Sequence, residues 1–584
     1  MPRRYREHDQ RVVTDLSGMW DFAFLGEVDP DTVSVTELRF DDPAGTYMAA
    51  VPGCFDATPA LAGRRGLAAY RRRILLADAT PHRLFLEGVH HWCRVFVDGQ
   101  PLRDHAGGFT RFATELRGHQ AGEAELVVLV DNRFDSERSP LHLEYFDWYH
   151  FGGIAGGAEL HRLGNLWIDS VQVTTTSTSP PTLQVRIAYG GVRPAGATAL
   201  TITLDGRHVF SETLKLDGVE GVVERTFEAP DAALWSPEAP NLHMLHVRLE
   251  NEPMEGDEGP PASDDLRTRI GLRIVEVCGQ EIRINGTAVR LLGFNRHAAH
   301  PQFGHAIPAM VQLSDVQQLR DLGANFVRGS HYPQDPGFLD LCDEAGLCVW
   351  SEAIGWQHTA LHLTDPHFTD AQAHHIDEMV AAAYNHPSII IWGILNESHS
   401  HDPACRPAYA ALLDKLRELD ASRPVTYACN HPFDDVCFDL VDIIAVNCYP
   451  GWYGSEIALI PEELDRIAAQ VDGPQGQSDK PLIISEIGAG AIYGWRDWHG
   501  ARWTEQYQVA LLETVIQHLF RDRDRYAGLA IWQFCDIRAS EAVQKILGRP
   551  RGFNNKGVVD EYRRPKLAYE AVKRAFHALN ESEL

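Results

Sequence analysis

The stretch NHPSIIIWGILNES, from Asn385 to Ser398, decides the fold. A turn is followed by a run of apolar, largely β-branched residues, and the run ends in Asn396 and Glu397, an amide beside a carboxylate. A strand that is apolar throughout, without alternation, is typical of a parallel sheet buried on both faces. The polar pair then marks the point where a buried strand emerges.

Seven further candidate strands lie between about residue 280 and the C-terminus, and helical segments separate them. The strand candidates are RLLGFNR, ANFVRGSHY, LCVWSEA, IIIWGILNE, VTYACN, DIIAVNCY, LIISEIG and LAIWQFCDIR. In the intervening segment 369–385 one helical face carries Ile376, Met379, Val380, Ala383 and Tyr384. Eight strand-then-helix units predict a C-terminal (β/α)₈ TIM barrel over residues 276–584.

The chain before the barrel is predicted to be all β. Residues 1–165 contain alternating or apolar segments separated by Asp-Gly and Gly-Gly turns, which is the pattern of a β-sandwich. Residues 166–275 continue this pattern over a length that suits an immunoglobulin-like β-sandwich. The acidic stretch 251–265, rich in Gly and Pro, is predicted to be an exposed loop of that domain. The fold class is therefore multidomain, β plus α/β.

Composition excludes several classes of protein. Hydrophobic residues make up 44% and charged residues 23% of the chain, and the net charge is 53 − 81 = −28. That charge disfavours binding to nucleic acid or to an anionic membrane, because phosphate is repelled. The start MPRRYREHDQ has no apolar run behind it, and no segment of about 20 apolar residues follows, so we expect a cytoplasmic protein. The ten cysteines form no C-x-x-C pair, and no zinc spacing is present, so we expect no metal and no cofactor.

The barrel prediction locates the chemistry. Active-site residues of such barrels lie at the carboxyl ends of the strands, and here those ends carry polar residues repeatedly. Glu397 ends the fourth strand and Glu486 the seventh. Two carboxyl groups that face each other across a pocket suit glycoside hydrolysis, in which one protonates the leaving oxygen and the other attacks the anomeric carbon or activates water. The structural alternative is that either glutamate pairs with an arginine such as Arg328.

Several long motifs resemble glycoside hydrolase family 2, which includes β-galactosidases, β-glucuronidases and β-mannosidases. They are NRHAAHP, RGSHYPQDPGFLDLCDEAGL, NHPSIIIWGILNES, PLIISEIGAG and NNKGVVDEYRRPKLAY. Upstream, FDWYHFGGIAGGAEL is similar to the end of the family's sugar-binding jelly roll, and LWSPEAPNLH is typical of its immunoglobulin-like domain. The resemblance covers nearly the whole chain and implies that residues 1–165 form a jelly-roll β-sandwich.

The resemblance also implies catalytic roles. Glu397 matches the family's general acid/base and Glu486 its nucleophile, in a retaining mechanism that passes through a covalent glycosyl-enzyme. Asn396 suits a hydrogen bond to the sugar 2-hydroxyl, and Tyr449 matches the tyrosine beside the nucleophile. His297 and His331 match sugar-contacting positions, for which a structural histidine is the alternative, and Trp532 matches the floor of the sugar site, for which plain core packing is the alternative.

The stretch GFNNKG points to the sugar. Asn554 and Lys556 match the Asn-x-Lys motif with which β-glucuronidases bind the substrate carboxylate, and an ammonium and an amide suit that group physically. Asp147 matches an aspartate that reaches the 4-hydroxyl, and Tyr453 a tyrosine near the carboxylate. Arg549 or Arg551 could add a second cation. The alternative is that Lys556 is a solvated turn residue before a glycine.

We therefore expect an exo-acting β-glucuronidase, with a β-galactosidase and then a β-galacturonidase as alternatives. GFNRHAAHP and NES resemble β-galactosidases more, and ILGRPR before GFNNKG departs from the glucuronidase pattern. A different class, an inactive carbohydrate-binding homologue, is disfavoured because both acids are present. No strand is followed by G-x-G-x-x-G, which disfavours a dinucleotide enzyme. The expected partner is a β-linked glycoside, and the protein is expected to be a homo-oligomer, either a dimer or a tetramer.

Overall fold

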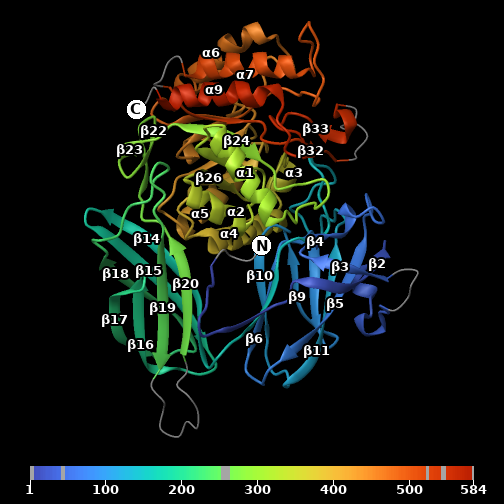
Figure 1. Cartoon of the computed structure of the whole chain (residues 1–584), viewed down its shortest axis with the longest axis vertical. Coiled ribbons are helices and arrows are strands. Elements are labelled where there is room, and N and C mark those ends of the chain that lie inside the picture. Colours follow the sequence, from blue (N-terminus) through green and yellow to red (C-terminus); the bar gives the residue numbers. More distant parts are fainter. Residues whose placement is uncertain (1–4, 41–45, 252–262, 521–524, 541–547, 582–584) are drawn as a thin grey trace. The chain divides into compact units, whose positions relative to one another are not determined.

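The computed structural model describes residues 5–40, 46–251, 263–520, 525–540 and 548–581 (Figure 1). The chain divides into two compact units. The first comprises residues 1–133, 152–274 and 381–387, and the second comprises 134–151, 275–380 and 388–584. Each unit is described by itself below. The loop 134–151, which the sequence places with the N-terminal domain, groups with the second unit.

The N-terminal part of the first unit is a β-sandwich, as its alternating segments predict. One antiparallel sheet has the order β3-β2-β5-β11-β8-β9, another β1-β13-β6-β10, and a small third sheet β4-β12-β7. The strands are β1 (Val12–Asp15), β2 (Gly18–Gly26), β3 (Thr46–Val51), β4 (Gly53–Cys54), β5 (Leu67–Leu76), β6 (His82–Glu87), β7 (Val89–His90), β8 (Trp92–Val97), β9 (Gln100–Ala106), β10 (Arg111–Leu116), β11 (Gly122–Asp131), β12 (Gly153–Ile154) and β13 (Ala158–Arg162). Buried side chains of the two large sheets, such as Tyr70 and Leu86, share one apolar core.

A second sandwich of seven strands completes the first unit, and it agrees with the predicted immunoglobulin-like domain. Its sheets have the orders β14-β15-β18 and β17-β16-β19-β20 around one core. The strands are β14 (Leu166–Thr178), β15 (Pro181–Gly191), β16 (Gly196–Leu204), β17 (Arg207–Leu216), β18 (Glu220–Glu228), β19 (His243–Asn251) and β20 (Ser263–Ile270). Of the predicted acidic loop, residues 252–262 lie outside the described residues. Its last three residues belong to β20, where Asp264 and Asp265 are buried, so this part of the loop prediction is wrong.

The second unit is built on a closed barrel of eight parallel strands in chain order, which confirms the TIM-barrel prediction. The barrel strands are β24 (Leu291–Arg296), β25 (Phe326–Gly329), β26 (Cys348–Glu352), β27 (Ile389–Asn396), β28 (Val425–Cys429), β29 (Ile444–Asn447), β30 (Leu482–Ile487) and β31 (Tyr526–Ile531). Every residue of β27 and of β30 is buried. Burial on both faces is the physical reason that these strands are apolar throughout.

Helices surround the barrel strands (Figure 1). They are α1 (Ala309–Asp321), α2 (Pro336–Ala345), α3 (Ala360–Leu363), α4 (Pro366–Ala383), α5 (Arg406–Leu419), α6 (Ile460–Asp472), α7 (Glu505–Leu519) and α9 (Leu567–Glu581). The connection from β28 to β29 departs from the predicted strand-then-helix repeat, because it holds only the 3-10 helix η4 (Phe438–Leu440). The other 3-10 helices are η1 (Pro30–Thr32), η2 (Val35–Glu37), η3 (Phe55–Ala57), η5 (Ile457–Leu459) and η6 (Pro550–Gly552).

Two short sheets flank the barrel in the chain. The strands β21 (Val275–Cys278), β22 (Glu281–Ile284) and β23 (Thr287–Ala288) precede it, and β32 (Ile537–Arg538) pairs with β33 (Phe553–Asn554) after its last strand. The β32–β33 pair sets Asn554 opposite Ile537 and so fixes the GFNNKG segment after β31. Among the helices of the described residues, none is long and apolar enough to cross a membrane.

Candidate active site

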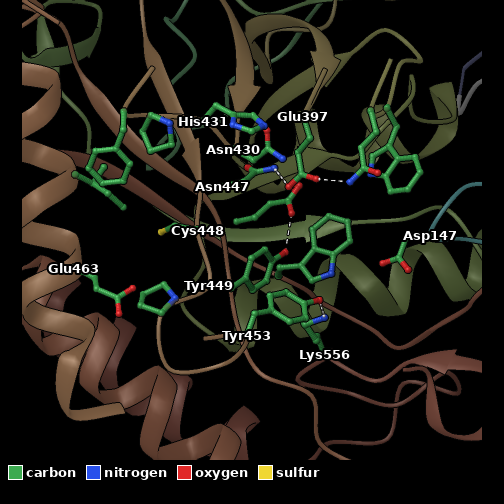
Figure 2. Close-up of a pocket in the computed structure, with 18 of the residues that line it drawn as sticks. Asp147, Glu397, Asn430, His431, Asn447, Cys448, Tyr449, Tyr453, Glu463 and Lys556 are labelled. Carbon is green, nitrogen blue, oxygen red and sulfur yellow. Dashed lines mark hydrogen bonds between the residues drawn. The ribbon is translucent and has the colours of Figure 1, made fainter. Parts of the chain in front are cut away.

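A cavity of about 700 Å³ opens among the loops that follow the barrel strands (Figure 2). Its lining includes Glu397 after β27, Glu486 in β30, and Tyr449 after β29. The acids that the sequence singles out on the fourth and seventh strands therefore share one cavity, at the barrel end where active sites of this fold lie. Its lining also includes Asp147, His331, Tyr453, Trp532 and Lys556 from the predicted set, whereas Asn396, His297 and Asn554 do not line it.

An irregularity at the end of β27 brings the side chains of Asn396 and Glu397 to the same amide. Successive side chains of a regular strand point to opposite faces. Here the pairing of β27 with β28 shifts register between Ile394 and Asn396, and Leu395 and Glu397 adopt φ angles of 38° and 49°. As a result Asn447 Nδ2 donates both to Asn396 Oδ1, at 2.9 Å, and to Glu397 Oε1, at 3.0 Å. Bulges and left-handed residues of this kind re-aim side chains at functional sites.

The carboxyl group of Glu397 is held by neutral groups. Asn447 donates to its Oε1, and Gln357 Nε2 donates to its Oε2 at 3.0 Å (Figure 2). No ion pair to Glu397 occurs within the described part of the chain. A carboxyl that is held only by amides can carry a proton without losing a charged partner.

The carboxyl group of Glu486 has a cationic partner. Tyr449 Oη donates to its Oε2 at 2.7 Å, and Arg328 Nη1 donates to its Oε1 at 2.9 Å. Burial and then the Glu397 charge raise the pKa of Glu486 to about 8, while Arg328 and Tyr449 oppose the rise. The carboxyl group of Glu486 therefore holds its proton more tightly than a free glutamate, although the guanidinium opposes this.

Arg328 is buried and binds several side chains at once, whereas the sequence indicated it only as a possible salt-bridge partner of one glutamate. Its guanidinium binds Glu352 at 2.8–3.0 Å as well as Glu486, and it also donates to Asn295 at 3.0 Å and to Asn396 at 2.8 Å. The ion pair of the structural alternative thus exists, but one guanidinium faces two carboxylates. Burial raises the pKa of Glu352 to about 7 against the lowering effect of Arg328. The available sequence signal was a Glu and an Arg at the ends of neighbouring buried strands.

Asp147 and Arg549 line the cavity and form an ion pair. Arg549 grips both carboxylate oxygens of Asp147 with bonds of 2.7–2.9 Å, and Asn554 Nδ2 donates to Asp147 Oδ2 at 2.8 Å. The loop 134–151 and the segment after β31, about 400 residues apart in sequence, thus meet inside the second unit. Asn554 lies behind Asp147, with its side-chain oxygen buried and without a partner among the described residues.

Lys556 is a buried cation in a cage of aromatic rings. It is 2% exposed and lines the cavity. Its Nζ donates to Tyr453 Oη at 2.9 Å and lies 5.0–5.8 Å from the ring centres of Tyr449, Trp452 and Tyr453. Burial raises the pKa of Tyr453, but Lys556 and Arg549 lower it, and the lowering prevails. No carboxylate pairs with Lys556 within the described residues, so the solvated-turn alternative does not fit its burial.

The two predicted histidines occupy different places. His331 lines the cavity and stacks on Trp532, with ring centres 5.2 Å apart. His297 lies behind it, 1% exposed, with Tyr332 Oη 3.2 Å from its Nδ1. Burial lowers the pKa of both histidines well below the usual value, so both rings are neutral at pH 7. His331 and Trp532 can therefore contact a ligand directly, and His297 can orient His331.

The first unit holds two overlapping clusters with residue types that could bind a metal, and both contain Asp265. In one of them His8 lies near Asp264 and Asp265. The backbone N–H groups of Asp9 and Gln10 donate to the two oxygens of Asp265, and Arg11 pairs with Asp264. Because these oxygens already accept hydrogen bonds, the cluster fits a structural tie between the N-terminal segment and β20.

Comparison with known proteins gives the following relatives. Residues 275–581 match the family described as "Glycosyl hydrolases family 2, TIM barrel domain". The chain is 28% identical to a beta-glucuronidase of Paenibacillus borealis, with 98% of each protein covered, and 27% identical to the beta-glucuronidase of Homo sapiens, with 85% of this chain and 80% of the human protein covered. A solved GH2 beta-galacturonidase from Eisenbergiella tayi, bound to galacturonate, is 34% identical with a TM-score of 0.90, and covers 99% of each chain.

Proposed function

We propose, on the premise that the chain belongs to glycoside hydrolase family 2 and hydrolyses glycosides, that its substrates are terminal β-D-glucuronides and that it retains the anomeric configuration. The observation that carries the choice of a uronide is Lys556. A buried cation without an anionic partner is costly, and a ligand carboxylate would supply that partner. The C6 carboxylate of a hexuronic acid is such a group, whereas a neutral hexoside offers none.

The neighbours of Lys556 support this orientation of the sugar. Tyr453 Oη accepts from Lys556 and keeps its own proton to donate to the same carboxylate. Asp147, fixed by Arg549 and Asn554, presents a carboxylate that can accept a hydrogen bond from a ring hydroxyl such as that on C4. We therefore assign Asn554 a positioning role through Asp147, in place of direct contact with the substrate carboxylate.

The hydrogen bonds of the two catalytic candidates support a division of roles. Glu486 has a guanidinium partner, which favours its ionised form, and Glu397 has only amide partners. These partners suit Glu486 to attack as a carboxylate and Glu397 to donate a proton. Glu397 acts as general acid and Glu486 as nucleophile.

The reaction then follows from these positions. Glu486 attacks the anomeric carbon while Glu397 transfers its proton to the glycosidic oxygen, and the aglycone departs as an alcohol. Glu397, now ionised, takes a proton from water, and that water cleaves the glycosyl ester of Glu486. Asn396 keeps Nδ2 unpaired among the described residues while its Oδ1 is occupied, so Nδ2 is available to the sugar 2-hydroxyl. Two displacements at one carbon retain its configuration.

A substrate panel tests the proposal. The p-nitrophenyl β-D-glucuronide, β-D-galacturonide, β-D-galactoside and β-D-mannoside are assayed side by side, and the glucuronide is expected to have the highest kcat/KM. Proton NMR of the early product is expected to show the β-anomer. Preference for the neutral galactoside would overturn the uronide assignment, and an initial α-anomer would overturn retention.

A second candidate is the β-D-galacturonide, which differs from the glucuronide only in the orientation of the 4-hydroxyl. The observation that favours it is the 34% identity to the galacturonidase structure bound to galacturonate. Both uronides would place their carboxylate at Lys556, so the panel decides between them at the 4-hydroxyl, on the side of Asp147 and Arg549.

A further inference from the structure

The cavity has an outer lobe that the reaction described above does not use. It lies between the loop after β28 and helix α6, and its walls include Asn430, His431, Phe433, Glu463 and Arg466. In Figure 2 Glu463 and Asp147 lie on opposite sides of Glu397. The short β28–β29 connection, which lacks an α-helix, contributes the first three of these residues.

The direction of the substrate determines what reaches this lobe. In a terminal glycoside the C4–C6 edge and the aglycone lie at opposite ends of the sugar ring. If the carboxylate lies at Lys556, the aglycone must extend past Glu397, which protonates the bond to it. Glu397 N donates to Ala428 O at 2.9 Å, so Glu397 is joined to β28 immediately before this lobe. Cavities of about 300–1,000 Å³ bury drug-sized ligands, so the volume of about 700 Å³ has room beyond one sugar ring.

The chemistry of the lobe matches a ring that carries hydroxyl groups. Asn430 has its side-chain oxygen buried and without a hydrogen-bond partner among the described residues, so it lacks a donor that a ligand hydroxyl could supply. Glu463 forms no ion pair within the described part of the chain. The Arg466 guanidinium forms no ion pair there either, and it lies 4.9 Å from the centre of the Phe433 ring. A carboxylate, a guanidinium and an amide can all bind hydroxyls, and the 43% exposed Phe433 offers a face for a pyranose ring.

We propose that the outer lobe is a leaving-group subsite that takes a second sugar ring, so that the substrate is an oligosaccharide with a uronic acid at its non-reducing end. This inference rests on the proposed function, because it takes the uronate to bind at Lys556. A planar aromatic aglycone could stack on Phe433, but without hydroxyl groups it would leave the side-chain oxygen of Asn430 without a donor.

The test compares three β-uronides that differ only in the aglycone. They are the methyl uronide, which has no second ring, the p-nitrophenyl uronide, whose ring lacks hydroxyls, and a disaccharide in which the uronic acid is linked to glucose. Arg466→Met and Asn430→Ala are each expected to lower the ratio of kcat/KM for the disaccharide to kcat/KM for the methyl uronide by about tenfold, the effect of losing a strong hydrogen bond. The ratio of kcat/KM for the p-nitrophenyl uronide to kcat/KM for the methyl uronide is expected to change less than about twofold.

The matched control for Arg466→Met lies outside the cavity lining. Arg574→Met removes an exposed arginine of α9 and is not expected to change either ratio. Unchanged ratios in Arg466→Met and Asn430→Ala, or an equal fall for the nitrophenyl and disaccharide substrates, would overturn the sugar subsite. A wild-type enzyme that hydrolyses none of the three uronides would overturn the proposed function instead, so the two failures are distinguishable.

Discussion

Arg328 donates a hydrogen bond of 2.9 Å to Glu486 from a guanidinium that is held on its other side by Glu352. All three side chains are buried. The charge that favours ionised Glu486 is therefore shared, and the amount of charge available to Glu486 depends on the protonation state of Glu352.

Glu352→Gln should shift the pH profile of the enzyme. The substitution removes the second carboxylate on Arg328, so the guanidinium acts more fully on Glu486 and lowers its pKa. We expect the acidic limb of kcat/KM, which the ionisation of Glu486 places near pH 8 in the wild type, to move to lower pH, and kcat to fall about tenfold while KM changes little. Steady-state kinetics from pH 5 to 9 measures both. A uniform loss of activity without displacement of the limb would indicate a purely structural role for Glu352.

Glu486→Gln should remove turnover. An amide cannot form the glycosyl ester, so kcat for p-nitrophenyl β-D-glucuronide is expected to fall by roughly 10⁴-fold or more, the size of loss found when a member of a catalytic unit is removed. Glu462→Gln, at an exposed position of α6, is the control and should remain active. A rate for Glu486→Gln within tenfold of the wild type would contradict the nucleophile assignment.

Glu397→Gln should damage poor leaving groups most. General acid catalysis contributes about 10²–10⁴-fold where the leaving oxygen needs a proton, and much less for an acidic phenol. The loss in kcat/KM is therefore expected to be far greater for the methyl than for the 2,4-dinitrophenyl β-D-glucuronide. Rates across a series of leaving groups with different pKa values measure this. Equal losses across the series would count against Glu397 as the acid.

The free energy of unfolding should fall as the pH rises from about 4.5 to about 8. Burial and Glu397 raise the pKa of Glu486 from 4.5 to about 8, so in this range the folded protein binds a proton that the unfolded chain has released. The contribution is fully present below pH 4.5 and is lost as the pH passes 8, and each pH unit between the unfolded and folded pKa values corresponds to about 1.4 kcal/mol. Glu352 and Asp536, with pKa values raised to about 7, act in the same direction.

Thermal denaturation at pH 5 to 8.5 checks this dependence. Tm is expected to decline across the range in the wild type and less steeply in Glu486→Gln, which has no carboxyl to titrate there. A Tm that rises with pH, or identical slopes in the two proteins, would contradict the raised pKa.

Lys556→Ala should discriminate between charged and neutral sugars. Loss of a buried charge-paired contact costs about 2–5 kcal/mol, so kcat/KM for the glucuronide is expected to fall at least about 30-fold. The β-galactoside, which has no carboxylate, should lose much less. Lys573→Ala, a partly exposed lysine of α9, is the matched control. Parallel losses for both sugars would show that Lys556 does not recognise the carboxylate.

The apolar pattern predicted the barrel, because strands buried on both faces cannot alternate. All eight candidate strands overlap a barrel strand, although the last begins at Tyr526, before the predicted start, and ends at Ile531, ahead of Gln533. The local sequence pattern did not predict that β28 and β29 are joined without an α-helix. Nor did it reveal the burial of Asp264 and Asp265. Asp265 accepts from the backbone N–H groups of Asp9 and Gln10, and Asp264 pairs with Arg11 and accepts from Ile168 N, all far away in the chain.

The sequence by itself determined the two catalytic candidates, since the resemblance and the strand-end rule both selected Glu397 and Glu486. Only the tertiary structure decided their surroundings. The Arg328 guanidinium binds two carboxylates, Asn554 donates to Asp147, and His297 packs against His331. Each of these contacts joins side chains that are far apart in the chain. Periodicity encodes the burial of a segment against its neighbours. Hydrogen-bond partners depend on where the loops converge, and that is set by the closure of the barrel.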